Sequence, residues 1–227
     1  LISAFRTTGQ RCVSMERLLV QESILEKFLP PFLDKARRIR IGDPLDEETF
    51  MGPLITEAAV QKFENYNRLA AQEGGQVLLD GRRLTEGRYA HGHFVSPFVY
   101  QMAHSPTKRV LNEEVFGPHV AVIPFKDVDD AIRIFNDNPY GGIALSVCTR
   151  DYRKARRVRE ECEFGVGYWN LPTIGAEVQL PFGGLKKSGT GIPSAAGLWE
   201  AVTHKVTWTV NYATEIRLAQ GLKTGVE

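Results

Sequence analysis

The chain has 227 residues, with 28 lysines and arginines against 27 aspartates and glutamates, so its formal net charge is only +1. This balance gives no electrostatic reason to bind nucleic acid or an anionic membrane surface. Its hydrophobic content of 43% is that of an ordinary globular protein. The sequence has no run of about 18 apolar residues that could cross a membrane. Its three widely separated cysteines form neither a disulfide framework nor a zinc-binding spacing, so we expect a reducing, cytoplasmic location.

Apolar segments of strand length alternate with helical patterns along most of the chain, which predicts an α/β fold. Strands are predicted over residues 17–21, 76–79, 93–100, 118–124, 143–149 and 166–169, the fifth of them buried. Helices are predicted over 24–36, from Thr56 to Gly74, from Asp127 to Phe135, and after Asp151. Ser23, Asp127 and Asp151 are expected to cap their helices, and the pair Pro30-Pro31 is expected to break or kink the first helix.

The character of the sequence changes after residue 170. Residues 171–197 contain three prolines and many glycines, so we expect a long loop, which is usually functional or disordered. Residues 203–212 then alternate apolar and polar side chains, with Val206, Trp208 and Val210 on one side. This period of two predicts a strand that has no obvious partner in the preceding sequence. We therefore expect a main domain over residues 1–202 and a strand with a tail over 203–227.

Cys12 is the strongest candidate nucleophile, and it ends the run Thr-Thr-Gly-Gln-Arg-Cys over residues 7–12. A thiolate attacks a carbonyl carbon readily, and the neighbouring cation of Arg11 favours the thiolate form. Gly9 lets backbone or substrate approach closely. A lone cysteine is also commonly a small buried hydrophobic residue, so this motif by itself leaves both interpretations open.

Two later segments favour the catalytic interpretation of Cys12. Residues 112–118 are Asn-Glu-Glu-Val-Phe-Gly-Pro, and residues 181–189 are Pro-Phe-Gly-Gly-Leu-Lys-Lys-Ser-Gly. Together with the Cys12 run, and in this order, they resemble three segments of the aldehyde dehydrogenase superfamily. Those are the catalytic-cysteine segment, the segment with the cofactor-ribose glutamate, and a late glycine-rich turn. The resemblance extends over essentially all 227 residues.

The resemblance implies the catalytic domain of the aldehyde dehydrogenase fold, a layered sheet with flanking helices, over residues 1–202. It also implies that residues 203–227 hold a strand that joins subunits into a homo-oligomer through Val206 to Val210. In that family, the dinucleotide-binding half and a Glu-Leu-Gly-Gly segment with the general base precede the cysteine. Neither is found in this sequence, and no G-x-G-x-x-G turn lies near its start. We therefore expect the C-terminal catalytic half of such an enzyme, without its upstream half and inactive by itself.

The reaction implied by the resemblance is the oxidation of an aldehyde to the acid, with NAD or NADP as cofactor. Cys12 would attack the aldehyde, hydride would leave to the nicotinamide, and the resulting thioester would be hydrolysed. Glu114 would bind the nicotinamide ribose hydroxyls, and Phe116 would pack near the cofactor. Lys62 would reach a ribose of the adenosine half. Without the resemblance, Glu114 would be taken as a surface carboxylate and Lys62 as a solvated helix lysine.

Some features point to the substrate. Phe182 resembles an aromatic wall of the family's substrate tunnel, although an aromatic residue before two glycines is otherwise most often core. Residues 172–177 and the tail 211–221 resemble the α-aminoadipic semialdehyde dehydrogenase branch, often called antiquitin. This branch implies that backbone N–H groups at Gly175 and Ala176 bind a substrate carboxylate and that Arg11 pairs with it. The substrate would then be a small aldehyde, in particular a semialdehyde that carries a carboxylate.

Two other interpretations stay open. A truncated, non-catalytic chain would keep the fold and only associate with itself, helped by apolar surface expected around Leu1, Ile2 and Phe5. A cysteine hydrolase would pair Cys12 with a histidine, but no histidine lies in the sequence context of such enzymes. The pair His91 and His93 lacks further ligands, so no metal site is expected.

Overall fold

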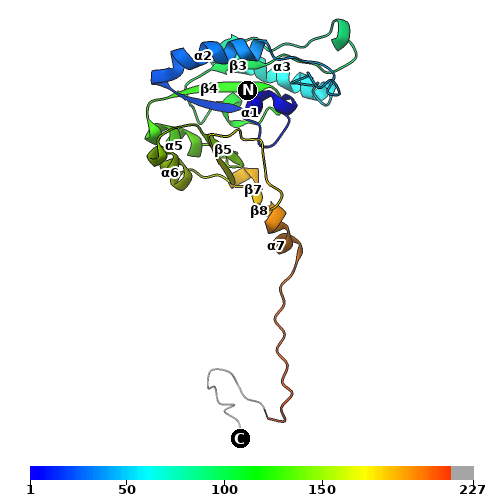
Figure 1. Cartoon of the computed structure of the whole chain (residues 1–227), viewed down its shortest axis with the longest axis vertical. Helices are drawn as coiled ribbons and strands as arrows, with labels where there is room; N and C mark the ends of the chain where they lie inside the picture. The colour runs from blue at the N-terminus through cyan, green and yellow to red at the C-terminus, as the bar shows by residue number, and fades with distance from the viewer. Residues whose placement is uncertain (216–227) are drawn as a thin grey trace.

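The computed structural model describes residues 1–215 of the chain and shows an α/β fold (Figure 1). A larger part contains a four-stranded sheet with helices packed against it, and a smaller part contains two short two-stranded sheets. After α7, residues 203–215 leave the smaller part as a long extended segment (Figure 1). The predicted layered sheet with flanking helices is therefore confirmed.

The larger sheet has the strand order β1-β4-β3-β2. Its strands are β1 (Arg17–Gln21), β2 (Gln76–Leu79), β3 (Phe98–Gln101) and β4 (His119–Phe125). The pairs β1–β4 and β4–β3 are parallel, whereas β3–β2 is antiparallel. Because β4 lies in the centre, residues around 16 and around 115, which are far apart in sequence, become neighbours at one end of the sheet. The register places Arg17 beside Ala121 and Phe98 beside His119.

Both faces of the larger sheet are buried, because alternate residues of a strand point to opposite faces. On β4, Val120 and Val122 pack into one hydrophobic cluster with Phe32 of α2 (Glu22–Arg37). Ala121 and Ile123 pack into the other cluster, with residues of α3 (Glu57–Gln72). A strand covered on both faces has a continuous apolar run, as Val120 to Ile123 shows.

The helix boundaries follow local capping, with two corrections. Thr56 begins α3 by accepting a hydrogen bond from the backbone N–H of Ala59, as expected. The expected cap at Ser23 is wrong, because α2 already begins at Glu22 and Gln21 precedes it without a side-chain cap. Of the break or kink expected at Pro30-Pro31, the break is wrong, since α2 is one helix. Both prolines lie on its exposed side, where water can hydrate the carbonyls that lose an N–H partner.

The smaller part follows in sequence. It contains α5 (Val128–Asn136), β5 (Ala144–Val147), α6 (Tyr152–Glu161) and β6 (Val166–Trp169), with β5 and β6 parallel. The short α4 (Arg109–Asn112) precedes the larger sheet's central strand. Asp127 and Asp151 cap α5 and α6 as predicted, accepting from the N–H groups of Asp130 and Arg153. The prediction of a buried strand is wrong for β5, whose residues are all half-exposed.

The region predicted as one long loop contains a hairpin. Strand β7 (Phe182–Gly184) pairs with β8 (Gly191–Ser194) in antiparallel fashion, and α7 (Leu198–Val202) follows. The prediction failed here because both strands are short and rich in glycine and proline, residues that normally indicate loops. The longest stretch of this region without a helix or strand is residues 171–181.

The segment 203–215 pairs with no strand among the described residues, so the oligomerisation strand and the 1–202 boundary stay predictions. Val206, Trp208 and Val210 are 72%, 83% and 49% exposed. The tail that carries part of the branch resemblance, 216–227, lies outside the described residues. At the other end, the exposure expected for Phe5 is wrong, because this side chain is fully buried against Phe32. No helix of the described part is long and apolar enough to cross a membrane.

Candidate active site

The segment that carries Cys12 has an unusual backbone. Thr7, Thr8 and Gly9 have positive φ angles of 57°, 59° and 68°. For β-branched residues such as threonine this conformation is a genuine outlier, costing about 1–3 kcal/mol each, and it persists only where the surroundings fix it. Here the hydroxyl of Thr8, a buried residue, donates to the carbonyl of Gly52 at 3.0 Å.

Gln10 adds a second anchor to the same neighbouring segment. Its Oε1 accepts from the N–H of Ile55 at 2.9 Å, and its Nε2 donates to the carbonyl of Pro53 at 3.2 Å. The next residues form a tight turn, in which Ser14 N–H donates to the carbonyl of Arg11 at 2.9 Å. Cys12 lies at the exposed tip of this turn. The turn therefore presents the thiol on a backbone that is held from both sides.

Gly9 brings a distant segment against the cysteine turn. A β-carbon added to Gly9 would overlap the carbonyl oxygen of Gly117 and would lie 2.5 Å from its carbonyl carbon. No side chain other than hydrogen fits this approach, and the positive φ of Gly9 also favours glycine. Residues 114–118, which we call the 114–118 loop, are thereby placed next to Cys12.

The 114–118 loop is itself strained and is held by a residue that the sequence motifs do not indicate. Phe116 has φ 62° and its side chain remains 39% exposed. The carboxylate of Glu16 accepts hydrogen bonds from the N–H of Val115 at 3.0 Å and from the N–H of Phe116 at 2.8 Å. Burial raises the pKa of Glu16 to about 7, although the two amide donors act in the opposite direction.

The third side of the site comes from the segment after β6. The hydroxyl of Thr173, a buried residue, donates to the carbonyl of Val13 at 2.6 Å, and the N–H of Thr173 donates to Ser3 Oγ at 3.1 Å. These bonds attach residues 173–176 to the cysteine turn. The Phe182 side chain reaches the same place from β7.

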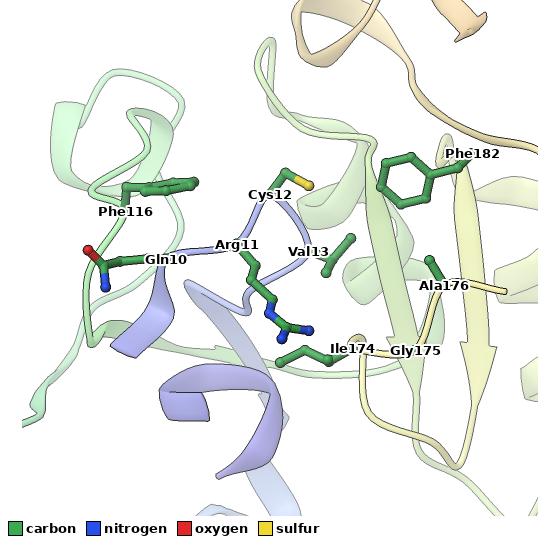
Figure 2. A pocket seen from close by; sticks show the side chains of 9 residues that line it. All are labelled: Gln10, Arg11, Cys12, Val13, Phe116, Ile174, Gly175, Ala176 and Phe182. Carbon is green, nitrogen blue, oxygen red and sulfur yellow. The ribbon is translucent and has the colours of Figure 1, made fainter. Parts of the chain in front are cut away.

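Together these segments enclose a cavity of about 560 Å³, shown in Figure 2. It is lined by Gln10, Arg11, Cys12, Val13, Phe116, Ile174, Gly175, Ala176 and Phe182. Six residues expected in the site are therefore brought together: Arg11, Cys12, Phe116, Gly175, Ala176 and Phe182. In Figure 2, the Cys12 Sγ points toward the side of Phe182, whereas the Arg11 side chain extends toward Ile174. The other three, Gln10, Val13 and Ile174, were missed. Nothing in the sequence distinguishes Val13 and Ile174 from ordinary apolar residues, and Gln10 was assigned no role within the Cys12 run.

The two remaining expected residues lie outside this lining and contact each other. Lys62 Nζ, on α3, donates to the backbone carbonyl of Glu114 at 2.7 Å. Partial burial raises the pKa of the Glu114 carboxyl above its usual range, while the nearby Lys62 ammonium acts to lower it. The Glu114 carboxylate accepts no hydrogen bond from residues 1–215, so both of its oxygens are open to a ligand.

The other cysteines and the histidines form no competing site among the described residues. Cys148 is exposed and lies outside the cavity, and burial raises the pKa of the Cys162 thiol to about 11. No histidine lines the cavity. His119 is buried beside Phe98, and burial lowers its pKa to about 4. Within residues 1–215, no group of three His, Cys, Asp or Glu side chains could hold a metal ion. The Cys–His arrangement of a cysteine hydrolase is therefore not formed around this cavity.

Comparison with known families identifies the class of protein. The profile of the aldehyde dehydrogenase family matches residues 1–208, and the chain belongs to this family.

Individual relatives agree with this assignment. Aldehyde dehydrogenase family 7 member B4 of Arabidopsis thaliana is 34% identical over 229 residues, which cover 99% of this chain and 43% of that protein. The mitochondrial succinate-semialdehyde dehydrogenase of Oryza sativa subsp. japonica is 40% identical over 191 residues, covering 84% of this chain and 35% of that protein. A point mutant of betaine aldehyde dehydrogenase from Staphylococcus aureus, solved in complex with NAD+, superposes with a TM-score of 0.82 at 31% identity. That match covers 93% of this chain and 45% of the other, so the chain spans less than half the length of these relatives.

Proposed function

We propose that this chain is the C-terminal catalytic half of an NAD(P)-dependent aldehyde dehydrogenase that oxidises its substrate through a thioester on Cys12. The observation that supports this most directly is the position of Cys12. Its thiol is at the tip of an anchored turn, in a cavity of about 560 Å³ between Phe116 and Phe182. A nucleophile in a largely apolar cavity with few polar groups is what a small-molecule enzyme requires.

The chemistry follows from the cavity. The thiolate of Cys12 adds to the aldehyde carbon, and the carbonyl electron pair moves to oxygen. The backbone N–H of Cys12 makes no hydrogen bond within residues 1–215 and is a donor for this oxyanion. NAD or NADP, when bound, would supply the acceptor for the hydride that leaves the same carbon. The thioester left on Cys12 is then attacked by water, which releases the acid and regenerates the thiol.

The residues present fit one part of the cofactor. The open carboxylate of Glu114 suits two ribose hydroxyls, which donate hydrogen bonds, and holding the ribose orients the nicotinamide. Phe116 lines the cavity from the same loop. Lys62 holds the loop through the carbonyl of Glu114 and remains a candidate for a second ribose contact. The binding site for the cofactor's pyrophosphate would come from an upstream half. The base that activates water would also come from there, because no carboxylate lines the described cavity.

For the substrate we propose a semialdehyde that carries a carboxylate, as in the antiquitin-like branch. The N–H groups of Gly175 and Ala176 make no hydrogen bond within residues 1–215, and Arg11 lines the same cavity without an ion-pair partner there. Two amides and one guanidinium form a suitable anion site. The relative named as a succinate-semialdehyde dehydrogenase supports this class.

Self-association is the second candidate function. Its support is the exposure of Val206, Trp208 and Val210 on a segment that pairs with no strand in the described chain. The homo-oligomer and the cytoplasmic location remain predictions from the sequence.

The thiol role of Cys12 is tested in the enzyme that joins this chain to a dinucleotide-binding half. Cys12→Ser should lower NADH formation by about 10⁴-fold or more, because the alcohol is a far weaker nucleophile. Cys148→Ser is the matched control, since Cys148 is also exposed but lies outside the cavity, and it should retain activity. The 227-residue chain by itself should form no NADH. Equal loss of activity in both variants would remove Cys12 from the mechanism.

The substrate class is tested with two aldehydes of matched length, one ending in a carboxylate and one in a carboxamide. Arg11→Gln should reduce kcat/KM for the acidic aldehyde by about tenfold, because one charge-assisted contact is lost, and should leave the neutral aldehyde nearly unchanged. An equal effect on both substrates would show that Arg11 does not bind a carboxylate.

A further inference from the structure

Glu16 occupies a position that connects the two strained segments of the site. It lies four residues after Cys12 and directly before β1. Its backbone is fixed to the larger sheet, because its carbonyl accepts from the N–H of Ala121 at 2.8 Å. Its side chain reaches the 114–118 loop, where it accepts hydrogen bonds from two backbone amides. One residue therefore joins the cysteine segment, the central strand and the loop.

Both oxygens of the Glu16 carboxylate accept hydrogen bonds from backbone amides. Oε1 accepts from the N–H of Phe116 at 2.8 Å and of Val115 at 3.0 Å, and Oε2 lies 3.1 Å from the N–H of Val115. Hydrogen bonds to an ionised acceptor are stronger than neutral ones. They fix two successive amides at the point where the backbone of Phe116 has a positive φ of 62°.

We propose that Glu16 is a positioning residue, whose carboxylate holds the 114–118 loop in its strained conformation so that Phe116 forms one wall of the cavity and Glu114 faces the cofactor. The contact between Glu16 and the 114–118 loop lies entirely within this chain, whereas the orientation of Glu114 toward a cofactor rests on the proposed function. A bulky residue in the left-handed region persists only where neighbouring contacts determine it. The two amide bonds to Glu16 are such contacts.

Glu73 provides a matched control within the same chain. Its carboxylate also accepts from two successive backbone amides, those of Arg109 at 3.2 Å and Val110 at 3.1 Å. Those amides begin α4 and do not line the cavity. A substitution at Glu73 thus removes the same kind of interaction from a different place, and it separates a specific effect on Phe116 from a general loss of stability.

The first experiment is residue-resolved amide hydrogen exchange on the 227-residue chain and needs no cofactor. Glu16→Gln should accelerate exchange at Val115 and Phe116 by about tenfold or more, because the side chain loses its charge and an NH2 group replaces Oε2, which also accepts from Val115. Ala121 should remain protected. Glu73→Gln should accelerate exchange at Arg109 and Val110 but not at Phe116. Unchanged exchange at Phe116 in Glu16→Gln, or an equal change in both variants, would overturn the proposal.

If Glu16→Gln does not fold, a second variant still tests the proposal. Glu16→Asp keeps the charge but is one methylene shorter, so its carboxylate should no longer reach both amides. Exchange at Phe116 should again be faster than in wild type, by a factor of up to about ten. Full protection of Phe116 in Glu16→Asp would also contradict the proposal.

The second experiment measures hydride transfer in single turnovers of the enzyme that joins this chain to a cofactor-binding half. Glu16→Gln should slow this step by about tenfold and change the aldehyde KM by less than about twofold, because the loop orients rather than binds the substrate. The double variant Glu16→Gln/Glu114→Gln should be no slower than Glu114→Gln alone. Additive losses would show that Glu16 does not act through Glu114. If wild type forms no NADH, the proposed function fails, whereas the exchange result still decides the role of Glu16.

Discussion

The cysteine segment and the C-terminal segment are opposite in how their backbones are held. Residues 7–16 contain positive φ angles at positions 7, 8 and 9. They are fixed by hydrogen bonds to Gly52, Ile55 and Thr173 and by the close approach of Gly9 to Gly117. Residues 203–215 have apolar side chains in solvent and no strand partner among the described residues. The chain therefore determines the geometry of its own nucleophile, whereas no strand within residues 1–215 fixes its C-terminal segment.

The largest effect is expected at the close contact of the cysteine segment. Gly9→Ala should lower the free energy of unfolding by about 3 kcal/mol or more, because the methyl group would overlap the Gly117 carbonyl and the φ of 68° disfavours alanine. Denaturant unfolding of the two proteins measures this. Gly74→Ala is the control, since Gly74 also has a positive φ, 95°, but open space around it. A smaller loss for Gly9→Ala than for Gly74→Ala would contradict the tight contact.

An intermediate effect is expected from the buried carboxyl of Glu16. Its folded-state pKa of about 7 exceeds its ordinary value of 4.5, so the folded protein binds more protons than the unfolded one between these pH values. The stability of wild type should therefore fall, relative to Glu16→Gln, as pH rises from about 4.5 to about 7, by on the order of 1–3 kcal/mol, and the difference should then stay constant.

Burial sets most of this effect, and nearby charged groups modify it. The carboxylate of Glu114 disfavours ionisation of Glu16, whereas the Lys62 ammonium favours it. Unfolding in denaturant at a series of pH values, for both proteins, is the measurement. A difference in stability that does not vary with pH would show that the carboxyl of Glu16 titrates as it does in the unfolded chain.

The smallest effect on folding is expected in the C-terminal segment. Trp208→Ser should change the free energy of unfolding by less than about 0.5 kcal/mol, because the side chain is 83% exposed and packs on nothing in the described chain. If this segment joins subunits, the same substitution should reduce the mass measured by analytical ultracentrifugation. Trp169→Ser, at a residue that is 46% exposed but lies within β6, serves as the comparison for loss of a tryptophan. A large loss of stability for Trp208→Ser in a monomer would contradict the structure.

Sequence patterns predicted the elements wherever one local rule dominated. The capping residues Asp127 and Asp151, the start of α3 at Thr56, and the strand boundaries at 17–21 and 166–169 are examples. The cavity residues came from motifs of a known family, not from periodicity. Where two rules competed, the prediction failed. In α2 the packing of Phe28 and Phe32 outweighs two prolines, and in the 182–194 hairpin tertiary contacts outweigh the loop character of glycine.

The sequence by itself determined the α/β class, the family motifs and the candidate nucleophile Cys12, because these depend on residue type and local spacing. Only the tertiary structure decided how the site is held. The role of Glu16 depends on parallel pairing of β1 with β4, which brings residues 99 and 100 positions apart in sequence into hydrogen-bond contact. The need for glycine at position 9 likewise comes from Gly117, and the attachment of Thr173 comes from Val13. Contacts of this kind leave no periodic pattern, because each partner lies on a different element of the fold.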